Sequence, residues 1–251
     1  MRAGGTIAPP ATKETATAAD GNSPPPHISS DGAIPAPLSL AVLLSGSGRT
    51  LENLLRAIAE GELAARVVAV VSSRPDVRGL AIAAHAGLPA FIRRRRDYAD
   101  DAAYGAAIYA VLAPYQPDLI LLAGFLRRLV VPPQWRGRIL NIHPALLPDS
   151  AAAGPGFYGE RVHTAVLASG ATRSGATVHV VDDGYDTGPV VLRTTVPILP
   201  DDSPASLGAR VFAAECTLYP AAIRHYLALH PELFGPARED ELPAASGTTE
   251  V

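Results

Sequence analysis

Two polar side chains near the middle of the chain have the spacing of a proton-transfer site. Asn141 and His143 are two residues apart at the end of an apolar stretch, and Pro144 follows them. Residues two apart in a β-strand point to the same side, so the amide and the imidazole are expected to project together. Pro144 cannot continue a hydrogen-bonded ladder and is expected to end the strand.

A second polar segment, residues 182–189, carries three aspartates between turn-forming residues: Asp182, Asp183 and Asp186. Such residues are sufficient for a simple solvated loop. A metal site is a further interpretation, but no second set of ligands accompanies the aspartates. We therefore expect no metal.

A carboxylate brought next to a histidine raises the pKa of that histidine, so Asp186 could keep His143 protonated at neutral pH. An imidazolium and the amide of Asn141 can both donate hydrogen bonds to a developing oxyanion. This set suits the attack of an amine on a formyl carbon. The alternative is that His143 satisfies a backbone carbonyl and Asp186 caps a turn.

The segment from Ser45 to Thr50 reads Ser-Gly-Ser-Gly-Arg-Thr and follows an apolar run. Its spacing matches neither the dinucleotide-binding nor the P-loop pattern. A glycine turn at the start of a helix still offers free N–H groups and a partial positive charge, which suit a phosphate. Gly48, Arg49 and Thr50 are the candidates. The alternative is a tight turn capped by Ser47 or Thr50.

Short apolar runs that alternate with helical patterns are expected to position these residues. Strands are expected at 38–44, 67–71, 90–92, 119–122 and 139–143, and near 176–181 and 190–196; helices are expected from 51, at 77–86, 100–112 and 161–168, and over 204–229. This order predicts an α/β fold with a mostly parallel, twisted sheet and helices on both faces. Ligands should bind after Leu44, Leu122, Ile142 and Val181.

Composition limits the domain count and the class of partner. With 251 residues and 48% hydrophobic content the chain can bury a core. Residues 1–37 are rich in Pro, Ala, Thr, Ser and Gly and are expected to be disordered, and residues 235–251 to form a flexible acidic tail. Residues 38–234 then have the size of one domain.

The formal net charge of −3 disfavours nucleic-acid binding, which usually needs a basic excess. Arg93 to Arg96 form one basic run, which we interpret as a solvated strand end or a contact for an anionic partner. The single cysteine, Cys216, cannot form an internal disulfide, and no membrane span or signal peptide is evident. We therefore expect a cytoplasmic protein.

Four motifs in this order resemble the phosphoribosylglycinamide formyltransferase family of purine biosynthesis. They are Ser45 to Gly48, Leu122 to Arg127, Asn141 to Pro148, and Asp182 to Pro189, and the likeness extends over roughly Leu38 to Leu229. Members of this family transfer a formyl group from 10-formyltetrahydrofolate to glycinamide ribonucleotide. The resemblance thus implies small-molecule substrates, no metal, no nucleic acid and no membrane, with a monomer or a homodimer as the functional unit.

The resemblance also implies a role for each matching residue. His143 is the proton donor, Asn141 binds the formyl oxygen, and Asp186 pairs with His143. Gly48, Arg49 and Thr50 hold the substrate phosphate, and Glu215 holds the ribose hydroxyls. The folate would be bound by Leu126, Arg127, Arg128, Leu129, Asn141, Asp182, Asp183, Gly184, Tyr185 and Asp186. His163 stands where the family often has a histidine.

Some positions depart from the family pattern. Thr50 replaces a common Asn, and Arg128 replaces an apolar residue. An arginine that often meets the folate tail is missing from 101–104, and Arg93 to Arg96 could supply that charge instead. The contacts of the folate tail are therefore left open.

Two other classes of function are compatible with these residues. Another enzyme could use the same donor, such as a sugar-amine or methionyl-tRNA formyltransferase or a formyl-folate hydrolase. The tRNA enzyme usually has a further C-terminal domain and the hydrolase an N-terminal one, whereas the tails here are short. A non-catalytic folate- or nucleotide-binding module is the other class, and the presence of Asn141, His143 and Asp186 together argues against it.

Overall fold

The computed structural model describes residues 37–148, 150, 152–154 and 156–234. The two tails that the sequence predicts to be disordered, 1–37 and 235–251, lie outside the described residues apart from Pro37. None of the helices within the described ranges is both long enough and apolar enough to span a membrane.

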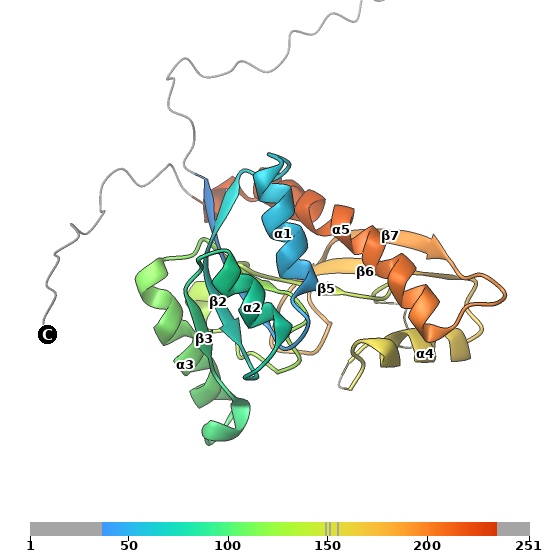
Figure 1. Ribbon diagram of the computed structural model, residues 1–251, viewed down its shortest axis with the longest axis horizontal. Coiled ribbons are helices and arrows are strands. Elements are labelled where there is room, and N and C mark those ends of the chain that lie inside the picture. Colours follow the sequence, from blue (N-terminus) through green and yellow to red (C-terminus); the bar gives the residue numbers. More distant parts are fainter. Residues whose placement is uncertain (1–36, 149, 151, 155, 235–251) are drawn as a thin grey trace, which may run out of the picture. The chain divides into compact units, whose positions relative to one another are not determined.

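Seven strands form one sheet in the order β3-β2-β1-β4-β5-β6-β7 (Figure 1). They are β1 (Leu38–Leu44), β2 (Ala65–Ser72), β3 (Ala90–Ile92), β4 (Leu119–Leu122), β5 (Ile139–His143), β6 (Arg173–Val180) and β7 (Val190–Pro197). The first five are parallel, whereas β6 and β7 pair antiparallel. The mostly parallel sheet that the sequence predicts is thereby confirmed.

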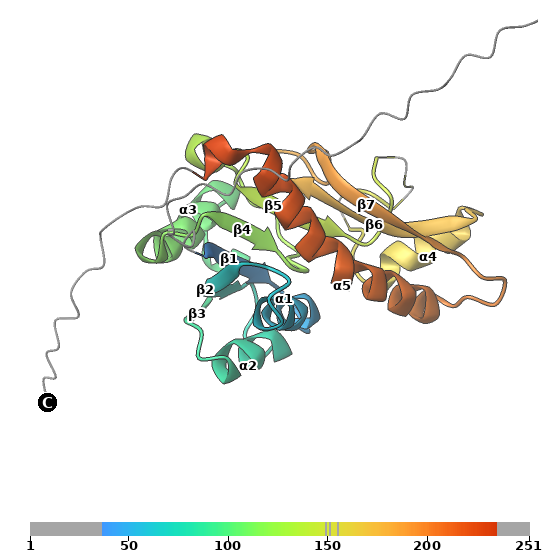
Figure 2. The ribbon, with the colours of Figure 1, turned by 90° about the horizontal axis from the view of Figure 1, so that it is seen from above.

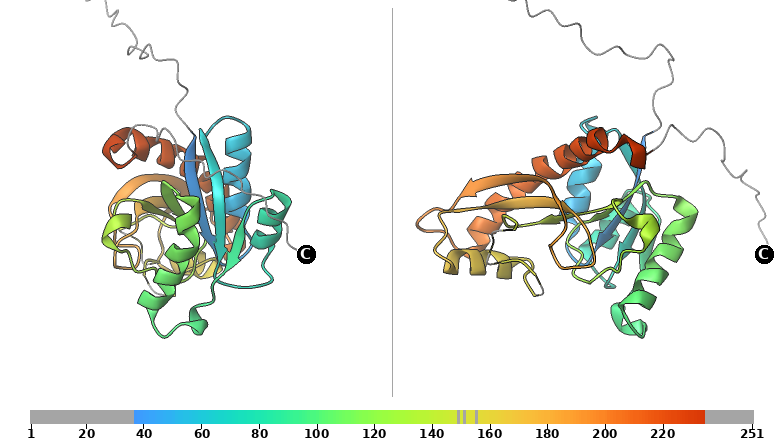
Figure 3. Two further views of the ribbon diagram at one scale, coloured as in Figure 1. Left: turned by 90° about the vertical axis from the view of Figure 1, so that its left-hand side faces the viewer. Right: turned by 180° about the vertical axis from the view of Figure 1, so that it is seen from behind.

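Within the described residues, five α-helices cover the sheet: α1 (Arg49–Ala59), α2 (Arg78–His85), α3 (Asp101–Leu112), α4 (Glu160–Ala168) and α5 (Pro204–Leu229). Short 3-10 helices cover Arg95–Asp97, Ala113–Tyr115, Pro133–Trp135 and Pro231–Leu233. Figure 2 shows the long helix α5 crossing the β5–β7 side of the sheet, and Figure 3 shows α3 on the opposite side of the strands from α1. The predicted helices on both faces are confirmed.

Alternate side chains of β1 explain why both faces are covered. Leu40, Val42 and Leu44 belong to the core that the sheet shares with α1, α2, α4 and α5, whereas Ala41 and Leu43 belong to the core under α3. Each of these five side chains is fully buried. A strand that is apolar on both faces must be buried on both, which is typical of a parallel α/β sheet.

The order of the strands reverses between β1 and β4, and open α/β sheets bind ligands at such a switch point. The chain segments that leave these two strands are joined by hydrogen bonds. Ser45 N donates to Gly124 O at 3.1 Å, and Leu126 N donates to Ser45 Oγ at 2.9 Å. The glycine loop and the segment after β4 therefore form one continuous wall.

A proline interrupts the hydrogen bonds of α5. Pro220 has no N–H, so the carbonyl of Cys216, four residues earlier, lacks its usual helical donor. Asn53 of α1 supplies the replacement, because its Nδ2 donates to Cys216 O at 2.8 Å. One residue before the proline, the buried Tyr219 hydroxyl lies 3.2 Å from Leu122 O and 3.0 Å from Leu140 O. The middle of α5 is thus bonded to α1, β4 and β5.

The aspartate loop does not leave its strand at the edge where the parallel strands end. Because β6 runs antiparallel, this loop starts beside the amino-terminal end of β5 instead, where Val181 N donates to Ile139 O at 2.9 Å. The loop must therefore fold back along the sheet for Asp186 to reach the site.

Candidate active site

A cleft of about 370 Å³ opens at the switch point. Its walls come from the glycine loop, the segment after β4, the end of β5, the segment before α4, the aspartate loop and α5: 45–50, 122–129, 141–144, 154, 156–159, 184–186 and single residues of α5. Most of the residues that the sequence singles out thus share one cavity.

The glycine loop approaches the neighbouring backbone closely. Gly48 is the N-cap of α1 with φ 72°, and a Cβ at this position would lie 2.4 Å from the Cα of Gly79. Only glycine tolerates both the positive φ and this contact. No side chain caps the helix, so the alternative of a cap by Ser47 or Thr50 is wrong. The first N–H groups of α1 are therefore left without a side-chain acceptor, as an anion site requires.

Arg49 and Glu215 lie on the α5 side of this loop. The guanidinium of Arg49 stacks 4.1 Å above the ring centre of Phe212. Burial raises the pKa of Glu215 to about 7, although the positive charge of Arg49 opposes the shift. Arg49 is thus near enough for its charge to act on the carboxyl group to which the resemblance assigns the ribose hydroxyls.

The amide, imidazole and carboxylate of the expected proton-transfer site converge. His143 Nδ1 lies 3.5 Å from Asp186 Oδ2, and Asn141 Nδ2 lies 3.5 Å from Asp186 Oδ1. Gly154 N donates to Asp186 Oδ2 at 3.1 Å, which joins the segment before α4 to the same carboxylate. Both contacts of Asp186 with the β5 side chains are at the long end of hydrogen-bonding distance.

Both nitrogens of the His143 ring face oxygen acceptors. Nε2 lies 2.9 Å from Ala152 O, and Nδ1 faces Asp186. Burial nevertheless lowers the pKa of His143 below its ordinary value; Asp186 and the Ala152 carbonyl raise it, but by less, and His179 lowers it further. The prediction that Asp186 keeps His143 cationic at neutral pH is therefore wrong for the ligand-free protein. Asp186 acts in the expected direction, but the desolvation of the ring outweighs it.

The conformation of Asp186 shows how the loop returns to the site. Its φ of 57° is in the left-handed region, which Asp and Asn tolerate better than most residues. Burial raises the pKa of Asp186, but the neighbouring His179 and the charge of His143 lower it by more, so the net shift is downward. The carboxylate is thus ionised at neutral pH.

His179 is a site residue that sequence reasoning missed. It lies directly opposite Asn141 in the antiparallel pair β5–β6, and its Nε2 is 3.0 Å from Asn141 Nδ2 and 3.6 Å from Asp186 Oδ1. The alternation of β6 places it on the same face as Thr177. The alternation in the sequence shows which face of its strand His179 occupies. It does not show that this strand pairs with β5, which only the sheet topology reveals.

His163 of α4 also lines the cleft. The residue is 6% exposed, and its Nδ1 has no hydrogen-bond partner among the described residues. Its ring packs closely against Gly208 of α5, where a Cβ would lie 2.8 Å from its Cδ2. Burial lowers the pKa of His163, and His143 and Arg49 lower it further. The surroundings of His163 thus favour the neutral form of its ring.

The residues assigned to the folate divide into two groups. One group lines the cleft and consists of Leu126, Arg127, Arg128, Leu129, Asn141, Gly184, Tyr185 and Asp186. The other group, Asp182 and Asp183, is not part of the described lining. Asp182 instead holds the loop, because Oδ1 accepts from Gly184 N and from Thr187 Oγ1. Asp183 contributes its carbonyl oxygen, which accepts from Arg128 Nη2 at 3.0 Å.

The exposed side chains at the mouth of the cleft are apolar as well as basic. Leu126 is 38% exposed and Tyr185 42% exposed, so both could cover a flat aromatic ligand. The run Arg93 to Arg96 is not part of the described lining; Arg94 pairs with Asp97, and Arg95 with Asp101. Arg74 lines the cleft although the sequence did not point to it.

A model of the formyl transferase family matches residues 38–223. The chain belongs to this family. Phosphoribosylglycinamide formyltransferase of Mycobacterium tuberculosis is 43% identical over 192 residues, which are 75% of this chain and 84% of that relative. The trifunctional purine biosynthetic protein adenosine-3 of Drosophila melanogaster is 41% identical over 188 residues, 73% of this chain, but the chain spans only 13% of that relative's length.

Solved structures of formyl transferases have the same fold. Glycinamide ribonucleotide transformylase 1 from Symbiobacterium toebii has a TM-score of 0.68 and 38% identity, and the match covers 74% of this chain and 86% of that one. Phosphoribosylglycinamide formyltransferase from Brucella melitensis has a TM-score of 0.67 and 38% identity, with 76% and 96% covered. The resemblance and the fold class drawn from the sequence are both confirmed.

Proposed function

We propose that this formyl transferase moves the formyl group of 10-formyltetrahydrofolate to the amine of glycinamide ribonucleotide in purine biosynthesis. One observation carries the proposal: an uncapped helix N-terminus at Gly48 and the group Asn141, His143 and Asp186 open into the same cleft. A substrate with a phosphate at one end and an amine at the other would need both. The names of the similar proteins support this choice of substrates.

The cleft offers a separate position for each part of the two substrates. The phosphate is assigned to the first N–H groups of α1 with Arg49 and Thr50, and the ribose hydroxyls to Glu215. The pterin ring is assigned to the opposite wall, which Leu126 and Tyr185 form.

The reaction forms one C–N bond and breaks another. The substrate amine attacks the formyl carbon, and the carbonyl oxygen becomes an oxyanion, which a donated hydrogen bond from Asn141 stabilises. Asn141 Nδ2 must then give up its contact with Asp186, which at 3.5 Å is weak enough to be exchanged. The oxyanion collapses, the bond from carbon to N10 breaks, and tetrahydrofolate leaves.

The net proton transfer runs from the attacking nitrogen to the leaving N10. Once the substrate has replaced the Ala152 carbonyl, a neutral His143 that carries its proton on Nδ1, facing Asp186, can take the proton at Nε2 and return it to N10. The lowered pKa of His143 favours this neutral starting form. Nε2 must exchange the Ala152 carbonyl for the substrate, because that carbonyl lies 2.9 Å away in the ligand-free protein. No step of this scheme requires a metal.

A substrate-omission assay tests the proposal. The full chain is incubated with 10-formyltetrahydrofolate and glycinamide ribonucleotide, and tetrahydrofolate is followed by absorbance and the N-formyl product by mass spectrometry. Product should form only when both substrates are present. A sugar amine and methionyl-tRNA replace the ribonucleotide in parallel reactions. Transfer to one of them alone, or hydrolysis of the donor without any acceptor, would contradict the proposal.

A further inference from the structure

The first two residues of α2 hold the glycine loop in place. Gly79 N donates to Gly46 O at 3.1 Å, and Arg78 Nη1 donates to Ser47 O at 3.3 Å. Two consecutive carbonyls of the loop are therefore bonded to two consecutive residues of α2. Residues 45–50 all line the cleft, whereas α2 contributes no residue to the described lining.

These two bonds fix the direction of the N–H groups in the loop. In a planar trans peptide the N–H points away from the C=O of the same unit, so the N–H groups of Ser47 and Gly48 point away from α2. No backbone carbonyl in the described part of the chain accepts from either group. Both N–H groups are thus left available to a ligand in the cleft.

Gly79 allows α2 to approach the loop this closely. A Cβ on Gly79 would lie 2.7 Å from both Cδ atoms of Leu44 and 3.2 Å from Gly46 O, the acceptor of its own N–H. The Cα of Gly79 is also the atom that a Cβ on Gly48 would meet. The loop and the start of α2 are therefore packed backbone against backbone, and this contact holds Arg78 beside the loop.

Arg78 also pairs with a carboxylate close to the proposed phosphate position. Its Nη2 donates to both carboxylate oxygens of Glu52, at 2.8 Å and 2.9 Å. Glu52 belongs to the first turn of α1, four residues after Gly48, and residues four apart share a face of a helix. One helical turn is about 5.4 Å, less than the roughly 10 Å over which salt screens a charge. An unpaired carboxylate here would therefore repel a phosphate at the helix N-terminus.

Stability alone does not account for this ion pair. The side chains of Arg78 and Glu52 are 53% and 55% exposed, and exposed pairs contribute little to folding. Their pairing matters more for an anion that binds next to Glu52, because it offsets the negative charge at that place.

We propose that Arg78 is a positioning residue of the phosphate site, an inference that rests on the proposed function. Arg78 holds the Ser47 carbonyl, so that the Gly48 N–H is directed away from α2, and it neutralises Glu52 beside the site. Arg78 is outside the described lining of the cleft, so it acts through the loop and through Glu52 and not by touching the substrate.

Steady-state kinetics of Arg78→Gln test the inference. The KM for glycinamide ribonucleotide should rise roughly fivefold, the scale of one charge at a helix end, while kcat and the KM for the folate donor change little. Arg224→Gln is the matched control, because Arg224 is an exposed arginine that donates to another loop carbonyl, Glu62 O, outside the cleft lining. It should leave all three constants unchanged, and thermal unfolding checks that both variants are folded.

A second substitution separates the effect of charge from a general disturbance of the loop. Glu52→Gln added to Arg78→Gln removes the carboxylate that has lost its partner. The KM for the ribonucleotide should then recover part of the way, since the bond to Ser47 O is still missing. No recovery, or an equal rise of KM for both substrates in Arg78→Gln, would overturn the proposal.

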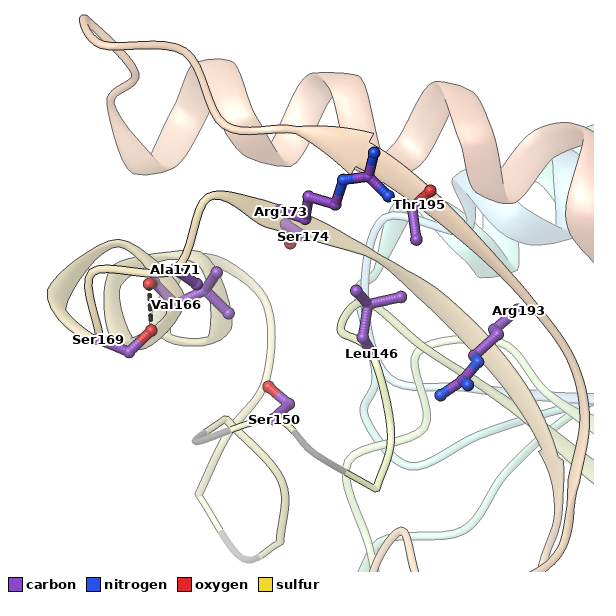
Figure 4. Close-up of a pocket in the computed structure, with 9 residues that line it drawn as sticks. All are labelled: Leu146, Ser150, Val166, Ser169, Ala171, Arg173, Ser174, Arg193 and Thr195. Atoms are coloured by element: carbon purple, nitrogen blue, oxygen red, sulfur yellow. Dashed lines mark hydrogen bonds between the residues drawn. The ribbon is translucent and has the colours of Figure 1, made fainter. Parts of the chain in front are cut away.

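A titration with inorganic phosphate gives a readout that does not depend on turnover. Saturable shifts of the Gly48 and Thr50 amides are expected in the ¹⁵N-labelled full chain, with weaker binding in Arg78→Gln. A second hollow of about 330 Å³ should not compete, because its arginines, Arg173 and Arg193, point in different directions (Figure 4). If the unchanged protein does not formylate the ribonucleotide, the proposed function fails but this titration still tests Arg78. Equal phosphate affinity of the two proteins would refute the role of Arg78.

Discussion

The side chains of Asn141 and His179 face each other across β5 and β6, with Nδ2 of the amide 3.0 Å from Nε2 of the imidazole. His179 Nδ1 lies 3.0 Å from the carbonyl of Val180, which can only accept a hydrogen bond. Nδ1 therefore carries the proton, and Nε2 accepts from Asn141. His179 thus fixes the orientation of the amide, with its nitrogen toward the imidazole and its oxygen away from Asp186.

Replacing His179 with leucine should remove this acceptor and let the Asn141 amide rotate. We expect kcat to fall roughly tenfold with little change in KM, because the amide is no longer held where the oxyanion forms. Steady-state rates with both substrates measure the effect, and thermal unfolding checks the fold. An equal loss in kcat and rise in KM would instead indicate a general disturbance of the cleft.

His143→Ala should lower kcat at least about 100-fold, since it removes the group that moves the proton. The matched control is His225→Ala, because His225 is an exposed histidine of α5 outside the cleft. Single-turnover rates with saturating substrates are the measurement. Activity of His143→Ala within a few-fold of the unchanged protein would refute the proposed proton path.

Asp186→Asn keeps the shape of the side chain but removes its charge. The charge of Asp186 raises the pKa of His143, so the variant should lower that pKa further and shift the acid limb of the pH–rate profile, where the neutral base forms, to more acidic pH. NMR titration of the histidine gives the pKa directly. An unmoved resonance would disprove the coupling.

Asp186→Ala differs from Asp186→Asn in its effect on stability. The residue has φ 57°, which Asn tolerates better than Ala, so Ala should also destabilise the loop by roughly 1 kcal/mol. Urea unfolding of both variants separates the electrostatic effect from the backbone effect. Equal stabilities would show that the left-handed conformation of the loop is not maintained.

Gly48→Ala should damage both folding and phosphate binding. The residue has φ 72°, and the new Cβ would lie 2.4 Å from the Cα of Gly79, which is backbone and cannot move cheaply. We expect a loss of about 2 kcal/mol or more in the free energy of unfolding and a raised KM for the ribonucleotide. Gly46→Ala is the matched control, because nothing lies within 4 Å of its Cβ position.

Glu215 makes the stability of the protein depend on pH. Its pKa is raised from 4.5 to about 7, so folding disfavours the carboxylate, and stability falls as pH rises from about 4.5 to about 7. Glu215→Gln stays neutral and should be about 1–2 kcal/mol more stable than the unchanged protein at pH 8, a figure reduced for partial exposure. At pH 4 the two should be equal. Urea unfolding at both pH values is the measurement.

The sequence was sufficient to predict the elements that carry a strong local pattern. The bounds of β4, β5 and α5 agree with the expected ranges, because buried apolar runs and a capped helix start are local signals. Pro220 within α5 did not mislead the prediction, since the apolar pattern continues past it. The glycine loop, Asn141 and His143 were likewise found from their position at strand ends.

What could not be predicted depends on contacts between distant segments. The antiparallel direction of β6 follows from pairing with β5, and this pairing is what brings His179 to Asn141. The protonation state of His143 depends on how deeply the ring is buried, and residue types alone do not give that depth. The sequence reveals the charge of the nearby Asp186, which raises the pKa of His143. It does not reveal the larger, opposite effect of burying the ring.

The hydrogen bond from Asn53 to the Cys216 carbonyl makes the proline and the asparagine an interdependent pair. Asn53→Ala alone leaves the Cys216 carbonyl without any donor. Pro220→Ala alone restores a helical N–H for this carbonyl, so the side-chain amide of Asn53 is no longer needed as its donor. With both changes the carbonyl is satisfied again, so the two substitutions should be strongly non-additive in unfolding free energy. The double variant would, however, lose the only side-chain hydrogen bond described between α1 and α5, two helices that both line the cleft. An irregularity in one helix thus supplies a hydrogen bond that ties it to a neighbouring helix.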